Sequence, residues 1–207
     1  MTGVSLTRRW LIATSMAGLS GCGFLPEEQE SVEASASQPA YLPASAASEA
    51  GYTAAVESKT TVETTVRIDL LGDVEMTNSR KAIATVFRRA YAADDGRRFG
   101  LVTAPAVEVY KQPEIIRDPV TALEPARVVE LATDASVEGV SEWSKDGTAT
   151  MLDTEVTLRT ATATGESGEV VLDRLRVRVG EDSVTAMVLT PEGTDRSAPF
   201  EAVKRDG

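Results

Sequence analysis

The sequence predicts an α+β domain in which an antiparallel sheet, built as a meander of hairpins, packs against one or two helices. Three observations predict it: apolar and polar residues alternate over residues 62–70, two glycine turns at 165–168 and 180–183 have compatible registers, and residues 124–132 have helical spacing. Alternation indicates strands with one buried face, and i, i+3, i+4 spacing indicates a helix. Hairpins with a separate helix are typical of the α+β class.

Residues 1–21 have the layout of a cleaved export signal. Arg8 and Arg9 are the only charged residues before Cys22, and a short apolar stretch follows them. The three residues in front of the cysteine are Leu19, Ser20 and Gly21. A basic start, a short apolar stretch and small residues at its exit are typical of a signal peptide. The apolar stretch is too short to span a bilayer as a helix.

Two motifs in this segment resemble those of exported lipoproteins. Residues 19–22 resemble the lipobox, and residues 7–12 resemble the twin-arginine export motif, with Trp10 where phenylalanine is commoner. The resemblance implies that a lipid is attached to Cys22, which becomes the new N-terminus. It places the chain at the outer face of the cell membrane. The general secretory route would serve the same lipobox if the twin-arginine motif did not function.

The remaining chain divides into three parts. Residues 22–40 are acidic and rich in Ser, Ala and Pro, and we expect a disordered tether there because few large apolar residues are available for burial. Residues 41–191 are predicted to form the single α+β domain. Residues 192–207 have no apolar periodicity and are predicted to be a disordered tail.

The first half of the domain holds one clear strand, one ambiguous segment and one helix. After the strand at 62–70, residues 71–73 are predicted to turn the chain. Residues 80–91 fit both a helix and a strand. Residues 124–132 fit a helix, because Pro125 suits its first position and Val128 and Leu131 share one face.

The second half is predicted to consist of hairpins. Asp146 and Gly147 are a hairpin signal that would join residues 137–144 to 149–152. The turn at 165–168 pairs Leu158 with Leu175, and the turn at 180–183 pairs Val177 with Ala186. Both registers place Leu175 and Val177 on one face, and a slip by one residue would turn them outward.

Composition excludes several classes of function. The chain has no histidine and one cysteine, which excludes the usual nucleophile–histidine pairs, disulfides within the chain and Cys-rich zinc sites. Its net charge is −11, and loss of Arg8 and Arg9 with the signal makes it −13. This charge argues against nucleic-acid binding. The acid-rich, lysine-poor composition resembles that of haloarchaeal proteins. We expect no cofactor and no metal.

Residues 41–191 resemble a haloarchaeal lipoprotein family of unknown function. The similarity rests on short motifs at residues 51–52, 74–78, 101–105 and 186–191, together with the twin-arginine lipobox. It implies an extended conformation after Asn78 and therefore favours a strand for residues 80–91. The order of elements resembles the PsbP-like α+β layout, and the family supplies no catalytic residues.

Arg174, Arg176 and Arg178 line one face of a predicted strand. They could bind anionic headgroups or an acidic partner. The interpretation we favour is a solvent face on which the arginines act as internal counter-charges, with Arg178 paired to Glu155.

Acidic residues occur in pairs at 94–95 and 181–182, and as a group at Asp69, Asp73 and Glu75. Calcium binding or glycosidase chemistry would need carboxylates, but the calcium-loop spacing is missing, and solvated turn residues are the interpretation we favour. Trp143 is expected to belong to the core.

The sequence therefore predicts a lipid-anchored extracytoplasmic protein that acts as a non-catalytic interaction or binding module. Its membrane partner would be reached through the lipid on Cys22, and its protein or small-molecule partner is unknown. Two alternatives are a carboxylate-based hydrolase and a small solute-binding lipoprotein.

Overall fold

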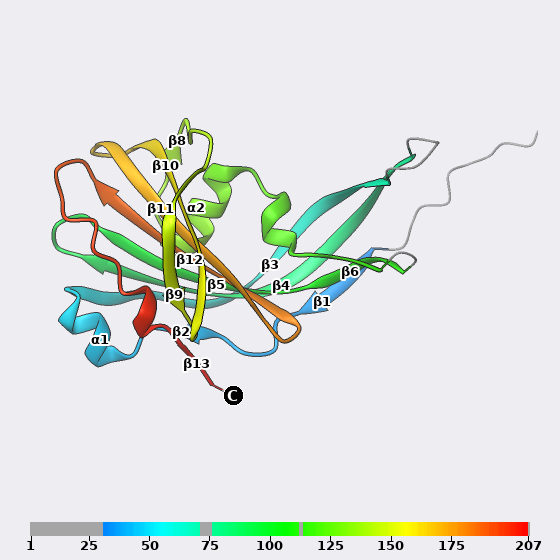
Figure 1. Cartoon of the computed structure of the whole chain (residues 1–207), viewed down its shortest axis with the longest axis horizontal. Coiled ribbons are helices and arrows are strands. Elements are labelled where there is room, and N and C mark those ends of the chain that lie inside the picture. Colours follow the sequence, from blue (N-terminus) through cyan, green and yellow to red (C-terminus); the bar gives the residue numbers. More distant parts are fainter. Residues whose placement is uncertain (1–30, 71–75, 112–113, 207) are drawn as a thin grey trace, which may run out of the picture.

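The computed structural model describes residues 31–70, 76–111 and 114–206, which fold as an α+β domain around one curled nine-stranded sheet (Figure 1). This confirms the predicted fold class. The strands of the sheet are β1 (Val32–Ser35), β3 (Tyr52–Leu70), β4 (Met76–Ala93), β5 (Arg98–Pro105), β8 (Val137–Glu138), β9 (Ser144–Met151), β10 (Thr154–Gly165), β11 (Gly168–Val179) and β12 (Asp182–Pro191).

Short elements complete the described chain. Two small pairs of strands are β2 (Ala40–Tyr41) with β13 (Lys204–Arg205), and β6 (Val107–Lys111) with β7 (Glu114–Arg117). The helical segments are α1 (Ala44–Glu49), α2 (Pro125–Thr133) and the 3-10 turns η1 (Pro119–Ala122) and η2 (Phe200–Ala202).

The sheet is antiparallel apart from one edge. Its strand order is β1-β4-β5-β12-β11-β10-β8, with β3 paired to β4 and β9 paired to β10. Only β1 runs parallel to its neighbour, β4, among the described strands. The β3–β4 hairpin is much longer than the rest and projects away from the body of the domain (Figure 1).

Both faces of the central strands are covered. On the helix face, α2 packs over a core that includes Leu172 and Met187. On the opposite face, which we call the terminal face, α1 and η2 pack over a core that includes Leu175 and Phe99 (Figure 1). Alternate residues of β11 therefore enter two different cores, which is why this strand carries apolar residues in both phases.

The predicted helix is confirmed as α2. Pro125 occupies its first turn, where the missing N–H leaves no hydrogen bond unmade, and Val128 and Leu131 are buried as the stripe predicts. The helix lies very close to β5 at Gly100, where an added Cβ would sit 2.0 Å from the carbonyl oxygen of Ala132. Glycine at this position therefore permits the helix to pack on the sheet.

The ambiguous segment at 80–91 is a strand, as favoured. It lies within β4, where Ala82, Ala84 and Val86 are all buried. Every second residue therefore faces the core, as in a strand, and the helical spacing of the apolar residues is not used. The strand predicted at 62–70 lies within β3. The turn predicted at 71–73 falls outside the described residues.

The register of the first predicted hairpin is confirmed, but its length is not. Gly165 pairs with Gly168 and Arg159 pairs with Arg174, where the ladder ends. Residues 154–157 of β10 pair with β9 instead. The expected Leu158–Leu175 pair is therefore absent from the described ladder, because the sheet curls and β10 leaves β11 at this point.

The register of the second hairpin differs by two residues from the prediction. Val177 pairs with Val184 and Val179 with Asp182, because only Gly180 and Glu181 form the turn. Gly180 has φ 61°, as a tight two-residue turn requires. A shift of two residues preserves the faces, and Leu175 remains buried as expected.

The Asp146–Gly147 hairpin prediction is wrong. Both residues lie inside β9, at a shift in its register against β10. Here the two residues of β9 lie opposite the single residue Leu158 of β10. Gly147 has φ 101°, a conformation that favours glycine, and it marks a β-bulge instead of a turn. The turn lies further along, between the paired residues Met151 and Thr154.

The two segments predicted to be disordered contain ordered structure. Within the predicted tether, β1 pairs with β4 and Ala36 and Ala40 are buried. Within the predicted tail, β13 pairs with β2 and Phe200 is buried. Both predictions failed because short segments that dock on an existing sheet need only one or two apolar side chains each, too few for a periodic pattern.

Candidate functional site

The predicted anchor and export residues lie outside the described residues. They are Arg8, Arg9, Leu19, Ser20, Gly21 and Cys22. In the described ranges, no helix has the length and apolar character needed to cross a membrane. The same ranges contain no cluster of three or more Asp, Glu, His or Cys residues that could hold a metal ion.

Three arginines gather on the helix face of the sheet. Arg159 on β10 pairs directly with Arg174 on β11, and Arg176 follows two residues further along the same face. Together with Val156 and Thr157 they line an open hollow of about 280 Å³, which we call the arginine hollow.

Arg176 is the one member of this group that has a carboxylate partner. Its Nε donates to Thr185 Oγ1 at 3.0 Å and lies 3.5 Å from Asp118 Oδ2. Its Nη2 is buried and has no hydrogen-bond acceptor among the described residues. Burial lowers the pKa of Arg176, and the charge of Asp118 acts in the opposite direction.

Arg174 has an aromatic neighbour in place of an anionic one. Its guanidinium carbon lies 4.0 Å from the centre of the Trp143 ring, a cation–π contact. Burial, followed by the charges of Arg176 and Arg159, lowers the pKa of Arg174 to about 10. The side chain is therefore still a cation at neutral pH. Trp143 itself is partly buried at the margin of the helix-face core, close to the expectation.

The expected role of the arginines as internal counter-charges holds only in part. Arg176 pairs with Asp118, but Arg159 and Arg174 form no ion pair with any described carboxylate. Arg178 does not pair with Glu155, and its Nε donates to the carbonyl oxygen of Gly180 at 3.3 Å. The expected Glu155–Arg178 pair fails because β10 leaves β11 before reaching these residues.

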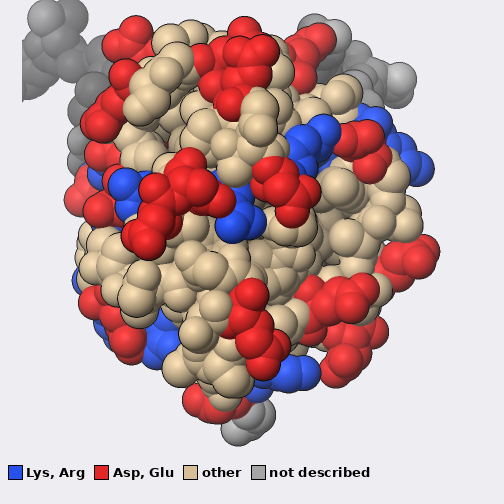
Figure 2. All heavy atoms as spheres, turned by 90° about the vertical axis from the view of Figure 1, so that its left-hand side faces the viewer, with Lys and Arg blue, Asp and Glu red and all other residues tan. Residues whose placement is uncertain are grey.

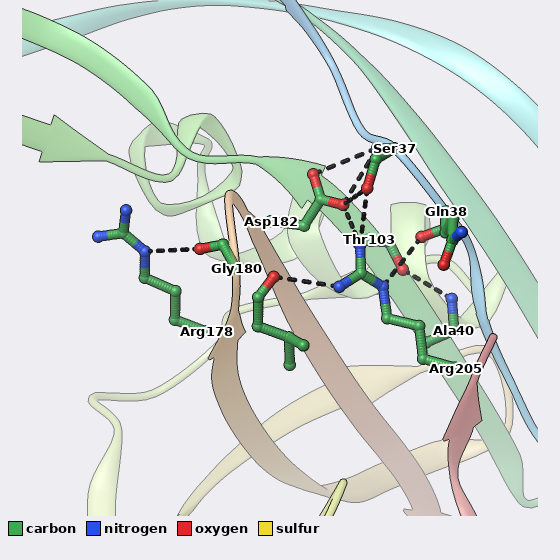
Figure 3. Close-up of polar contacts among 9 residues, drawn as sticks. Ser37, Gln38, Ala40, Thr103, Arg178, Gly180, Asp182 and Arg205 are labelled. Carbon is green, nitrogen blue, oxygen red and sulfur yellow. Dashed lines mark hydrogen bonds and ion pairs between the residues drawn. The ribbon is translucent and has the colours of Figure 1, made fainter. Parts of the chain in front are cut away.

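A second polar cluster joins segments near both ends of the described chain to the turn between β11 and β12 (Figure 3). Asp182 is 2% exposed and accepts hydrogen bonds from the Ser37 hydroxyl at 2.6 Å and from Arg205. Arg205 also donates to the Val179 carbonyl at 3.0 Å. The prediction of solvated turn residues is therefore wrong for Asp182.

Asp173 is the other buried aspartate of β11 and β12. Its Oδ1 accepts from Arg196 Nη2 at 2.7 Å, and the Thr160 hydroxyl also donates to it. The hydrogen bond to Asp173 raises the pKa of Arg196, against a smaller effect of burial. Arg196 comes from the segment predicted to be a tail.

The buried carboxylates are too far apart to act as a catalytic pair. Asp182 pairs with Val179, six residues along β11 from Asp173, a separation of about 20 Å. Glycosidase pairs lie about 5–9.5 Å apart. Of the other acidic candidates, Asp95 forms an ion pair with Arg97 at 2.7 Å. Asp73 and Glu75 lie outside the described residues, and the side chain of Asp69 is not described.

Sequence reasoning missed Arg159 in the hollow, and also Arg196 and Arg205. The first could have been found, because the correct register of the β10–β11 hairpin places Arg159 opposite Arg174. The other two gave no signal, because they follow β12, the last strand of the main sheet, and pair with aspartates 23 positions earlier in the sequence.

A comparison with protein-family models finds a match to a domain of unknown function (DUF6517) over residues 39–205. No curated protein and no solved structure matches the chain. The matched range includes β2 and β13, the paired strands that join the two ends of the domain, and leaves out β1.

Proposed function

The chain belongs to the DUF6517 family of domains of unknown function, and we propose that it is a non-catalytic binding module held by a lipid at the outer face of the cell membrane. The lipid would be attached to Cys22 after removal of residues 1–21. Stable attachment would need two acyl chains on this residue, because one chain anchors only marginally. The acidic composition supports a high-salt, haloarchaeal setting for this module.

The anchor is supported by the lipobox at residues 19–22 and by Arg8 and Arg9 in front of the apolar stretch. Because β1 begins at Val32, only nine residues lie between it and Cys22, and the ten Cα–Cα steps from Cys22 to Val32 can span at most about 35 Å. The domain would therefore stay close to the membrane surface. This is a shorter tether than the sequence alone suggests.

The observation that carries the non-catalytic role is the state of the buried carboxylates. Asp173 and Asp182 each receive an arginine, and they lie about 20 Å apart along β11. Neither is available as a general acid or base, and together they do not flank one cleft. A binding role remains the function that the arrangement supports best.

Replacing the lipidated residue tests the anchor. In a Cys22→Ser variant, no thioether can form, so the protein should appear in the soluble fraction or remain unprocessed. Fractionation of cells, followed by mass measurement of the protein, distinguishes these cases from a lipidated mature chain. An Arg8→Lys, Arg9→Lys variant serves as the control for export, because it keeps Cys22 and alters only the twin-arginine pair.

Two results would contradict the proposal. A processed Cys22→Ser chain that still sediments with membranes would show that the lipid is not the anchor. Turnover of glycosides or esters by the purified domain, abolished by one Asp or Glu substitution, would favour the hydrolase alternative.

A further inference from the structure

We propose that the arginine hollow binds a phosphomonoester group, carried either by a soluble ligand or by a lipid headgroup. This names a ligand class for the proposed binding module. The site does not depend on the lipid at Cys22, so either proposal can fail without the other.

The first argument is electrostatic repulsion within the hollow. Arg159 and Arg174 lie directly opposite each other on neighbouring strands, an arrangement that is destabilising for like charges. No described carboxylate pairs with either of them, although the chain has 32 acidic residues and 21 basic ones. At the end of the domain shown in Figure 2, by contrast, carboxylates are spread over the surface with basic side chains among them. An external anion would relieve this repulsion.

The second argument is the charge of the hollow. The three arginines contribute three positive charges, and Asp118 is the one described carboxylate that forms an ion pair with any of them. The net charge near the hollow is therefore close to +2. A phosphomonoester carries about −1.5 to −2 at pH 7, whereas a carboxylate carries only −1. The dianion is the better match.

The third argument is the supply of hydrogen-bond donors. Arg159 and Arg174 donate to no described acceptor, and the buried Nη2 of Arg176 also has none. Guanidinium groups present their donors in a planar fork that fits phosphate oxygens in pairs. Trp143 holds the guanidinium of Arg174 from one side, which limits its freedom before a ligand arrives.

The size of the hollow defines how much of a ligand it can take. Its volume of about 280 Å³ lies just below the range of about 300–1,000 Å³ that is usual for pockets enclosing whole small molecules. It is also open at the surface, with the exposed residues Thr157 and Arg159 at its margin. These dimensions suit a terminal phosphate whose remaining part extends into solvent or into a membrane surface.

Thermal unfolding of the purified protein in sodium phosphate, compared with sodium chloride at equal ionic strength, tests the proposal. Phosphate and glycerol 3-phosphate should raise Tm, since they bind only the folded state, and acetate should do so much less. In Arg174→Gln and Arg159→Gln variants, the apparent Kd for phosphate should weaken about tenfold or more. Arg178→Gln is the matched control, because it removes the same charge from β11 outside the hollow.

Arg159→Gln also distinguishes a ligand site from a structural one. Arg159 is exposed, so this variant should fold, and without phosphate it should be at least as stable as the unchanged protein because a repulsion is removed. When phosphate is added, the Tm of this variant should rise by less than the Tm of the unchanged protein. Flotation with phosphatidylcholine vesicles, with and without phosphatidic acid, identifies the source: binding that needs phosphatidic acid and Arg174 assigns a headgroup, and binding of glycerol 3-phosphate alone assigns a soluble ligand.

Three outcomes would overturn the proposal. One is the absence of any effect of phosphate, glycerol 3-phosphate and phosphatidic acid. Another is an effect of acetate equal to that of phosphate. The third is an equal loss in Arg178→Gln, which would indicate general attraction of anions to the strand instead of a site.

Discussion

Asp182 contacts residues from both ends of the described chain. Ser37 approaches it from the N-terminal side and Arg205 from the C-terminal side, and all three side chains point toward one another in Figure 3. A buried carboxylate is stable only when an opposite charge lies next to it and its oxygens accept hydrogen bonds. The ion pair with Arg205 and the hydrogen bonds from Ser37 supply this match, so the turn between β11 and β12 is tied to segments near both ends of the described chain.

Replacing Asp182 by asparagine should lower the free energy of unfolding by about 3–5 kcal/mol, because it leaves the charge of Arg205 without its partner. Denaturant unfolding followed by circular dichroism measures this difference. Glu181→Gln removes the same charge from the exposed neighbour and should change stability by no more than about 0.5 kcal/mol. Similar values for the two variants would contradict the structural role of the Asp182–Arg205 pair.

Contacts of this kind could not be predicted from the sequence. Ser37 and Asp182 are 145 positions apart, and a hydrogen bond between such distant segments leaves no periodic pattern in the sequence. Arg159 is different, since a correct hairpin register is enough to place it opposite Arg174. The candidate site could therefore be predicted only in part. The spacing of the arginines on β11 predicts that they share one face. The absence of the expected Glu155–Arg178 pair could not be predicted, because it follows from the curl of the sheet.

Strands and helices could be predicted where buried residues recur at a regular period, but the strand registers that depend on the length of a turn could not. β4 and α2 were assigned correctly because their apolar residues fall on one face at a regular period. The β11–β12 register was shifted by two, since turns of two and four residues bury the same face. The turn predicted at Gly147 is a bulge, because a glycine with positive φ occurs in both kinds of structure and the sequence does not distinguish them.

The C-terminal segment shows how little apolar surface is needed to dock an element. η2 places Phe200 against Phe99, with ring centroids 6.0 Å apart, and Phe200 is 5% exposed. β13 follows and pairs with β2. The buried side chains of Phe200 and Val203 and one short ladder therefore dock this segment on the terminal face.

A Phe200→Ala substitution should destabilise the protein by about 3–5 kcal/mol, the usual range for removing a buried phenylalanine. Equilibrium unfolding in urea measures the change. The exposed neighbour provides the control, because Glu201→Ala removes no buried surface and should alter the midpoint very little. A loss below about 1 kcal/mol for Phe200→Ala would mean that the C-terminal segment contributes little to the core.

The whole molecule combines a sheet buried on two faces with a strongly acidic exterior. The chain has 32 acidic and 21 basic residues, and on the face drawn in Figure 2 the carboxylates are distributed without a single dominant patch. Ion pairs with both side chains exposed, such as Lys81–Glu63 and Arg127–Glu130, contribute little. The remaining charges repel one another in the compact state.

This repulsion predicts that salt stabilises the protein. At about 1 M salt the Debye length falls to about 3 Å, so repulsion between surface carboxylates is screened and the free energy of unfolding should rise with sodium chloride. Thermal unfolding over a salt series at pH 7 measures the effect. Near pH 4.6, the isoelectric point of the sequence, the net charge is close to zero and the same series should give a smaller rise. An equal rise at both pH values would assign the salt effect to strengthened burial of apolar surface instead of to screening of carboxylates.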